Sequence, residues 1–220
     1  MNKTAQLNAL FEQWKQAMPP NEGGFVADGI IDEQLFNQAS KKILFITKEP
    51  NNPKQVAGDF REWWQQRLEG GFSLRIAEWA HGLLHDFPVF DRISQEQHHE
   101  AIRSIAFMNL KKVGGGGTAV GSSIIEHVRN YHHYLLQEID IIQPDIIITG
   151  ISGKPLREEL FGKLDWKASG YGIEIAQFNN AKVIDFYHPS SRNAPAAAYC
   201  LLERVVKALF SSVPQNRFND

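Results

Sequence analysis

The chain has only one cysteine, Cys200, among its 220 residues. A single cysteine cannot form a disulfide within the chain, and it excludes an all-cysteine metal site or an iron–sulfur centre held by one chain. Cys200 lies in an apolar stretch with helical spacing, so we expect it to be a small buried side chain. Any chemistry must therefore be carried by other residue types.

An excess of charge of either sign is also missing. Lysine and arginine number 23 against 25 aspartate and glutamate residues, which gives a formal net charge of −2. The chain as a whole thus lacks the strongly basic character of many nucleic-acid-binding domains. Any contact with nucleic acid must come from a local patch.

Long apolar runs are a third absence. No stretch approaches the about 18 consecutive apolar residues of a membrane-spanning helix, and residues 1–6 lack the apolar core of a signal peptide. No Pro/Gly/Ser-rich linker divides the chain, and 43% of its residues are hydrophobic, enough for a sizeable core. We expect one domain over residues 1–220, with an N-terminal helical extension over 1–39 and a loose tail over 214–220, in a soluble cytoplasmic protein. The oligomeric state stays open.

What the sequence does contain is an alternation of strand-like and helix-like segments. Apolar runs predict strands at 43–47, 105–110, 145–150 and 183–187, and residues 172–178 alternate like an edge strand or hairpin arm. Helical spacing predicts helices over residues 4–17 (with Thr4 as N-cap), 33–39, 74–84, 94–104 (opened by a Ser-x-x-Gln capping box), 124–142, 155–161 and 196–210. Nearly continuous apolar strands alternating with helices are typical of a parallel sheet covered on both faces. The predicted fold is a three-layer α/β/α sandwich with a mainly parallel sheet of four or five strands.

Three polar side chains follow the predicted parallel strands. Glu49, whose turn is fixed by Pro50, follows the first strand; Asn109 ends the second, and His188 follows the last. Ligands in open α/β sheets bind outside the carboxyl ends of the strands. A carboxylate, an amide and an imidazole at one edge can activate water, hold a polar heterocycle and stabilise a leaving anion.

Four short motifs follow one another along the chain at the ends of predicted strands or within them. They are Lys48-Glu49-Pro50, the run 107–112 (FMNLKK), the run 143–150 (QPDIIITG) and His188-Pro189-Ser190. Together they resemble the successive signatures of the uracil-DNA glycosylase superfamily over roughly residues 40–210. The resemblance implies the fold predicted above and an enzyme that flips a damaged base out of DNA and hydrolyses its N-glycosidic bond. It implies neither a metal nor another cofactor, and the cysteine count excludes the iron–sulfur branch.

The resemblance also implies roles for individual residues. Glu49 matches a position where some branches place an Asp that orients or activates water, and His188 matches the His that bonds uracil O2. Asn109 matches the Asn that reads the base edge, Phe60 the aromatic on which the base stacks, and Pro50 lies beside them. The residues expected to contact DNA are Lys48, Lys111, Lys112, Ser190, Ser191 and Arg192.

The sequence departs from the family pattern around these motifs. Lys48 stands where active branches usually carry Gln or Glu, Thr47 where they carry Gly, and Asn51 replaces the Tyr or Gly after the proline. Residues 191–194 stand where the family usually carries a Pro-Leu-Ser or similar loop that presses into the DNA duplex. Two alternative functions therefore stay open: a catalytically silent base-, nucleotide- or nucleic-acid-binding module, and a small-molecule or nucleoside hydrolase on the same scaffold. Lys111, Lys112 and the glycines after them fit a flexible surface loop equally well.

Overall fold

The computed structural model describes residues 2–68, 70–116, 119–151 and 153–210. Its helices are α1 (Lys3–Ala17), α2 (Glu33–Gln38), α3 (Phe60–Gln66), α4 (Gly70–Leu84), α5 (Gln95–Arg103), α6 (Gly121–Ile142), α7 (Lys154–Phe161) and α8 (Pro195–Phe210), with a 3-10 turn at Phe90–Arg92. Its strands are β1 (Val26–Ala27), β2 (Gly29–Ile30), β3 (Ile43–Thr47), β4 (Gly58–Asp59), β5 (Ala106–Asn109), β6 (Ile146–Thr149), β7 (Lys167–Ala168), β8 (Glu174–Phe178) and β9 (Ala181–Asp185).

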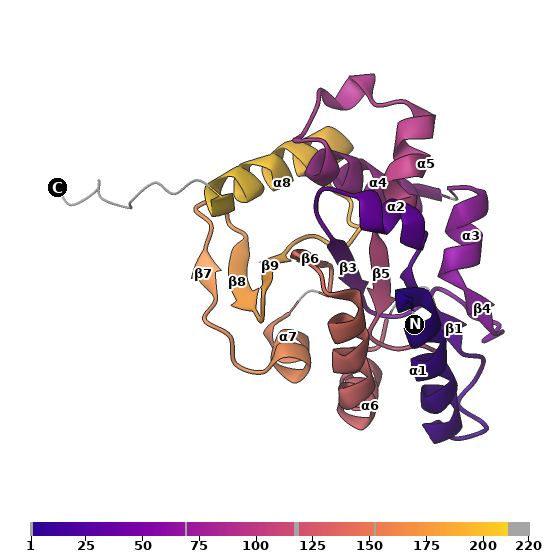
Figure 1. The fold of residues 1–220 in the computed structure, drawn as a ribbon. Coiled ribbons are helices and arrows are strands. Elements are labelled where there is room, and N and C mark those ends of the chain that lie inside the picture. The colour runs from indigo at the N-terminus through magenta and orange to yellow at the C-terminus, as the bar shows by residue number, and fades with distance from the viewer. Residues whose placement is uncertain (1, 69, 117–118, 152, 211–220) are drawn as a thin grey trace.

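A mixed sheet of seven strands occupies the centre, in the order β2-β5-β3-β6-β9-β8-β7 (Figure 1). The α/β class is thus confirmed. The four neighbours β5, β3, β6 and β9 are parallel and correspond to the four apolar runs. The expected sheet of four or five strands is too small, because β2, β7 and β8 add antiparallel pairs at the two sides. β2 and β7 have two residues each, too few to show a sequence period.

Helices cover both faces of this sheet. Helices α1, α6 and α7 pack on one side, and α4, α5 and α8 on the other (Figure 1). Alternate residues of each strand divide between the two cores: in β3, Leu44 and Ile46 face one, and Ile43 and Phe45 face the other. This two-sided burial explains why the strands read as continuous apolar runs.

Residues 1–39 are more than a helical extension. Helix α1 buries Leu7 and Trp14 completely, and β2 pairs with β5, so this segment belongs to the central sheet and core. The N-cap lies two residues earlier than expected, at Asn2 rather than Thr4, since the Asn2 side chain accepts a hydrogen bond from the Ala5 main-chain N–H. The expected tail at 214–220 lies outside the described residues.

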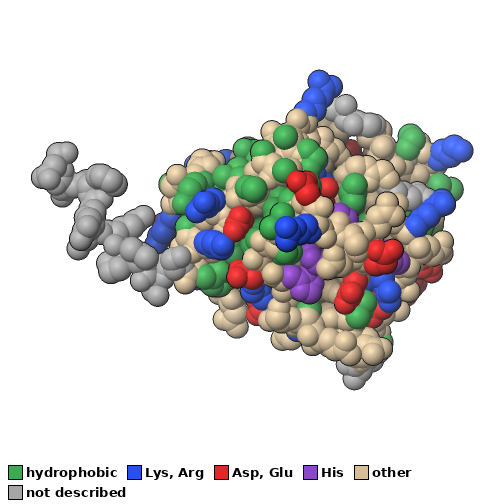
Figure 2. All heavy atoms as spheres, turned by 90° about the horizontal axis from the view of Figure 1, so that it is seen from above, with side chains coloured by type: hydrophobic (Ala, Val, Ile, Leu, Met, Phe, Trp, Pro, Cys, Tyr) green, Lys and Arg blue, Asp and Glu red, His purple; other side chains and the backbone are tan. Residues whose placement is uncertain are grey.

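Two further expectations concern single residues. The Ser94 capping box that opens α5 is confirmed, because both reciprocal hydrogen bonds to Gln97 are present. Cys200 is exposed on α8, so the expectation that it is buried was wrong. The buried face of the helix includes the preceding residue, Tyr199, and helical spacing alone did not distinguish these neighbours. In the described part of the chain, no helix has the length and apolarity needed to cross a bilayer. Positive and negative side chains are interspersed on the face shown in Figure 2.

A buried histidine on α6 is expected to make stability depend on pH. The His127 ring accepts the Lys112 main-chain N–H at Nε2 (3.4 Å), and its Nδ1 lies 3.2 Å from Glu22 Oε1. Burial first, and then the charges of Lys111 and Lys112, lower the pKa of His127 to about 3. The ring is thus neutral, and Nδ1–H donates to Glu22.

A lowered histidine pKa means that the unfolded chain binds one more proton than the folded chain between pH 6.5 and about 3. The stabilisation is therefore complete above pH 6.5 and is lost as the pH falls. We expect His127→Gln to reduce the slope of unfolding free energy against pH by about 1.4 kcal/mol per pH unit in this range. Urea unfolding between pH 4 and 7 measures the slope. His133→Gln, at an exposed position on the same helix, is the control; equal slopes in both variants would contradict the prediction.

Candidate functional site

The ends of the parallel strands bring three of the predicted site residues to one edge of the sheet. Thr47 pairs with Asn109 in register, and beyond them the Lys111 N–H donates to the Lys48 carbonyl at 2.9 Å, so residues 47–49 run beside 109–111. His188 follows β9 and lies against the end of β6: a Cβ on Gly150 would lie 3.2 Å from His188 Cα. Among the described residues, no hydrogen bond or ion pair joins Glu49, Asn109 and His188 directly.

Asn109 is the most constrained of these residues. Its side chain is buried, and its main-chain N–H donates to Asp28 Oδ2 at 2.7 Å. Its Oδ1 accepts a hydrogen bond from Thr47 Oγ1, also at 2.7 Å. The Nδ2 group is buried and has no hydrogen-bond partner. Because an unpaired buried donor is unfavourable, Nδ2 is the group best suited to a ligand acceptor.

Glu49 lies in a covered turn after β3. Its side chain is 6% exposed, and Oε2 lies 3.2 Å from Lys111 Nζ, which also donates to Ser123 Oγ. Pro50 is buried, and its carbonyl accepts the N–H of Gly115 at 3.0 Å. The glycine-rich segment after Lys112 therefore lies directly over the carboxylate, which restricts the access of bulk water to it.

The contact between Gly115 and Glu49 depends on the missing side chain. A Cβ on Gly115 would lie 2.3 Å from Glu49 Cδ, whereas a Cβ on Gly116 meets nothing within 4 Å. We expect Gly115→Ala to displace the Glu49 carboxylate from Lys111 and to lower the unfolding free energy by about 1 kcal/mol, because the side-chain end moves and its ion pair is lost. Gly116→Ala is the matched control, with an expected change within about 0.5 kcal/mol. Thermal unfolding compares the two, and equal midpoints would contradict the prediction.

His188 is held as a neutral donor. Its Nδ1 accepts the Ser190 main-chain N–H at 3.1 Å, so in the neutral ring Nε2 carries the proton. Burial first, and then the positive charge of Lys48, lower the pKa of His188. A neutral imidazole with a fixed Nε2–H can donate to an oxygen that becomes negatively charged.

An aromatic cluster of Phe60, Trp64, Phe72 and Phe107 flanks His188. The ring centroid of Phe72 lies 5.8 Å from that of His188 and 5.9 Å from that of Phe107. Phe60, the predicted stacking residue, lies 4.9 Å from Phe107 between ring centroids, and in the described part of the chain its ring has no contact with that of His188. Sequence reasoning missed Phe72, which precedes the apolar face assigned to α4 and carries no motif.

The residues predicted to contact DNA fall into two groups. Ser190 and Arg192 are exposed and Lys48 and Ser191 half-buried, within or beside the turn that carries His188. Lys111 is half-buried, and its ammonium group is paired with Glu49.

The prediction that Lys112 contacts DNA is wrong. Its side chain is fully buried, with Nζ 2.5 Å from Asp28 Oδ1 and 2.8 Å from Glu138 Oε2. Phe11 and Trp14 surround the same ammonium group at 5.4 and 5.3 Å. Lys112 therefore neutralises buried carboxylates and cannot reach a phosphate at the surface.

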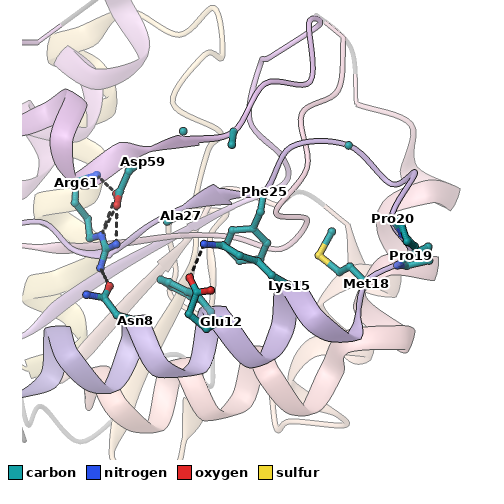
Figure 3. A pocket seen from close by; sticks show the side chains of 14 residues that line it. Asn8, Glu12, Lys15, Met18, Pro19, Pro20, Phe25, Ala27, Asp59 and Arg61 are labelled. Carbon is teal, nitrogen blue, oxygen red and sulfur yellow. Dashed lines mark hydrogen bonds and ion pairs between the residues drawn. The ribbon is translucent and has the colours of Figure 1, made fainter.

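The cleft in Figure 3, of about 480 Å³, lies between α1 and residues 57–61. None of the predicted site residues lines it. Its charged groups already have partners: Arg61 binds Asp59 at 2.6 Å, and Lys15 binds Glu12 at 2.8 Å. The charged side chains of the cleft thus pair with one another, and the strand ends offer the better-defined chemistry.

Metal ligation has no support in the described residues, since none of their His, Cys, Asp or Glu side chains form a group of three able to hold an ion. Comparison with known proteins adds no assignment: no protein-family model matches the sequence, and no curated protein matches it significantly.

Proposed function

We propose that this chain is a DNA glycosylase that hydrolyses the N-glycosidic bond of a flipped uracil or other deaminated base. The finer form of the fold, a three-layer sandwich of the uracil-DNA glycosylase type, is part of this proposal. The observation that carries it is the unpartnered Asn109 Nδ2, which lies at the sheet edge that also receives Glu49 and His188. A donor, a carboxylate and a second donor are the groups that this reaction requires.

In the proposed reaction, Asn109 Nδ2 donates to a carbonyl oxygen of the base. Glu49 orients a water molecule toward the anomeric carbon and stabilises the positive charge that develops on the sugar. As the N-glycosidic bond breaks, its electrons pass to the base, and the His188 Nε2–H donates to the base oxygen that becomes negative. Water adds its hydroxyl to the sugar, and the base leaves with a proton. Aromatic stacking of the base contributes about 1–3 kcal/mol.

DNA binding in this proposal depends on a small local surface. Lys48, Ser190, Ser191 and Arg192 lie in or beside the His188 turn, where a flipped nucleotide would bring its phosphates. The net charge of −2 and the burial of Lys112 limit this surface to few cationic contacts. Binding should therefore weaken only modestly with salt, by about 0.9 logarithmic units per tenfold salt increase for each phosphate contacted.

A second candidate is a module that binds a base or nucleotide without turnover. The ion pair between Lys111 and Glu49 favours it, because a carboxylate already paired with an ammonium group is a weaker activator of water. The third candidate is a hydrolase of small nucleosides. Because a nucleoside has no phosphate backbone, the kcat/KM of such an enzyme should not depend steeply on salt concentration.

An oligonucleotide assay tests these candidates. Single- and double-stranded oligonucleotides with one uracil, hypoxanthine or xanthine are incubated with the full chain in EDTA, and abasic sites are detected by alkaline cleavage. We expect cleavage at the modified base only. No abasic sites on any of the substrates would contradict the proposal; binding of a free base without turnover would then support the second candidate.

A further inference from the structure

Asn109 is held from two sides by residues with no role in the proposed reaction. Asp28 Oδ2 accepts its main-chain N–H, and the Thr47 hydroxyl donates to its amide oxygen, both at 2.7 Å. Asp28 is 0% exposed and Thr47 is 2% exposed, so water does not compete for either bond. With the main chain and Oδ1 fixed, the direction of the unpartnered Nδ2 is fixed as well.

Asp28 is itself held by a buried cation. Its Oδ1 binds Lys112 Nζ at 2.5 Å, and the same ammonium group lies 2.8 Å from Glu138 Oε2, with all three side chains 0% exposed. The Lys112 carbonyl also accepts the Val26 main-chain N–H at 2.7 Å, which ties the segment before Asp28 to the end of β5. One oxygen of Asp28 thus serves the cation, and the other serves Asn109.

The buried charges of this network suggest that it serves to position Asn109. A hydrogen bond to an ionised acceptor is shorter and about twice as strong as a neutral one. Burying ionised groups, however, is expensive, and apolar side chains of the same volume often give equal or greater stability. What the ionic arrangement provides beyond apolar packing is one fixed geometry for the Asn109 main chain.

We propose that Asp28 and Thr47 are positioning residues that orient Asn109 so that Nδ2 is the group presented to a ligand. Asp28 belongs to residues 1–39, the part of the chain outside the family resemblance, so the N-terminal segment completes the site. The identity of the ligand, a base with a carbonyl acceptor, rests on the proposed function. The orientation of the amide does not.

The chain offers a matched set of variants. Thr47→Val removes the hydroxyl beside Asn109 without changing the side-chain shape. Thr149→Val makes the same change one strand away, at a buried threonine that donates to Asp185 Oδ1 at 2.8 Å, and serves as the control. Asp28→Asn removes the charge that Asn109 faces. If it does not fold, the double variant Asp28→Asn/Lys112→Met removes both members of the ion pair.

Nuclear magnetic resonance of the full chain reads the orientation without any substrate. We expect Asp28→Asn, or the double variant, to shift the Asn109 main-chain amide proton upfield, and Thr47→Val to shift the Asn109 side-chain NH₂ signals. In the uracil oligonucleotide assay, kcat should fall about 10- to 100-fold in each variant, the effect of a small misplacement. Thr47→Val and Thr149→Val each remove one buried hydrogen bond, so both should lower the unfolding midpoint by a similar amount. Of these two, only Thr47→Val should lower kcat and shift the Asn109 signals.

The outcomes separate the two proposals. If the wild-type chain has no turnover, the proposed function fails, and titration with free uracil then reports on Asn109 Nδ2 directly. If the Asn109 signals stay at wild-type positions in the folded Asp28 and Thr47 variants, the positioning inference is overturned, whatever the turnover. A fall in turnover without any change in these signals overturns it too.

Discussion

Replacing Lys112 with methionine is expected to lower the unfolding free energy by about 3–5 kcal/mol, the usual effect of removing one partner from a buried ion pair. Methionine fits the apolar contacts with Phe11 and Trp14, but it leaves Asp28 and Glu138 without a cation in a fully buried site. Urea unfolding at pH 7 measures the loss. Lys154→Met is the control, because this lysine is 74% exposed in a weak pair with Glu158; its expected effect is below about 0.5 kcal/mol.

The same variant should show a distinctive pH dependence. Burial raises the pKa of Glu138 even in the presence of Lys112. A carboxyl group whose pKa is higher in the folded chain than in the unfolded chain stabilises the fold fully at pH values below its unfolded pKa. This stabilisation is lost as the pH rises through its folded pKa. We therefore expect the deficit of Lys112→Met to be largest near pH 8 and to shrink toward pH 4.

A double variant tests whether the loss comes from unpaired charge. Asp28→Asn in the Lys112→Met background removes one of the two stranded carboxylates and leaves Glu138, so the double variant should be more stable than the sum of the single effects predicts. A double-mutant cycle measures this coupling. Strict additivity, or a Lys112→Met variant as stable as the Lys154→Met control, would refute the assignment of Lys112 to a buried ion pair.

The second large effect is on catalysis. Glu49→Gln should reduce kcat on the uracil oligonucleotide by about 10²- to 10⁴-fold, because glutamine keeps the shape of the side chain but loses the charge that activates water. Binding of the substrate should change little, since Asn109 and His188 are untouched. Single-turnover cleavage gives the rate, and filter binding gives the affinity.

Glu158→Gln is the control for this measurement. This residue is 42% exposed on α7, so the same chemical change should leave both rate and affinity at wild-type values. Equal rates for wild type and Glu49→Gln would remove Glu49 from the mechanism. If the wild type and Glu49→Gln both bind the oligonucleotide but neither cleaves it, the silent base-binding module is favoured instead.

Several elements could be predicted from residues close together in sequence. The apolar runs at 43–47, 105–110 and 145–150 contain β3, β5 and β6, and the run at 183–187 overlaps β9, which begins and ends two residues earlier. A strand buried on both faces needs apolar residues on both, so such strands stand out in the sequence. The Ser94 capping box was equally readable, since its hydrogen bonds join residues three positions apart. The short antiparallel strands were not, because two residues show no period.

The pair Lys111–Lys112 shows where local patterns fail. Two adjacent lysines resemble a basic patch, but the two side chains lie in different surroundings: Lys111 is half-buried and Lys112 is fully buried. Lys111 reaches Glu49, and Lys112 enters the core. The carboxylate that binds Lys112 comes from Asp28, 84 positions earlier, and no sequence spacing indicates such a partner.

The sequence by itself determined the class of the fold and the residue types delivered to the strand ends: a carboxylate, an amide and an imidazole. Only the tertiary structure decided which of their atoms are free. Asn109 is bound by Thr47 and Asp28, 62 and 81 positions away, so a single donor, Nδ2, is left unpaired. Strand identity follows from local burial patterns, whereas hydrogen-bond partners follow from which distant segments the fold places side by side.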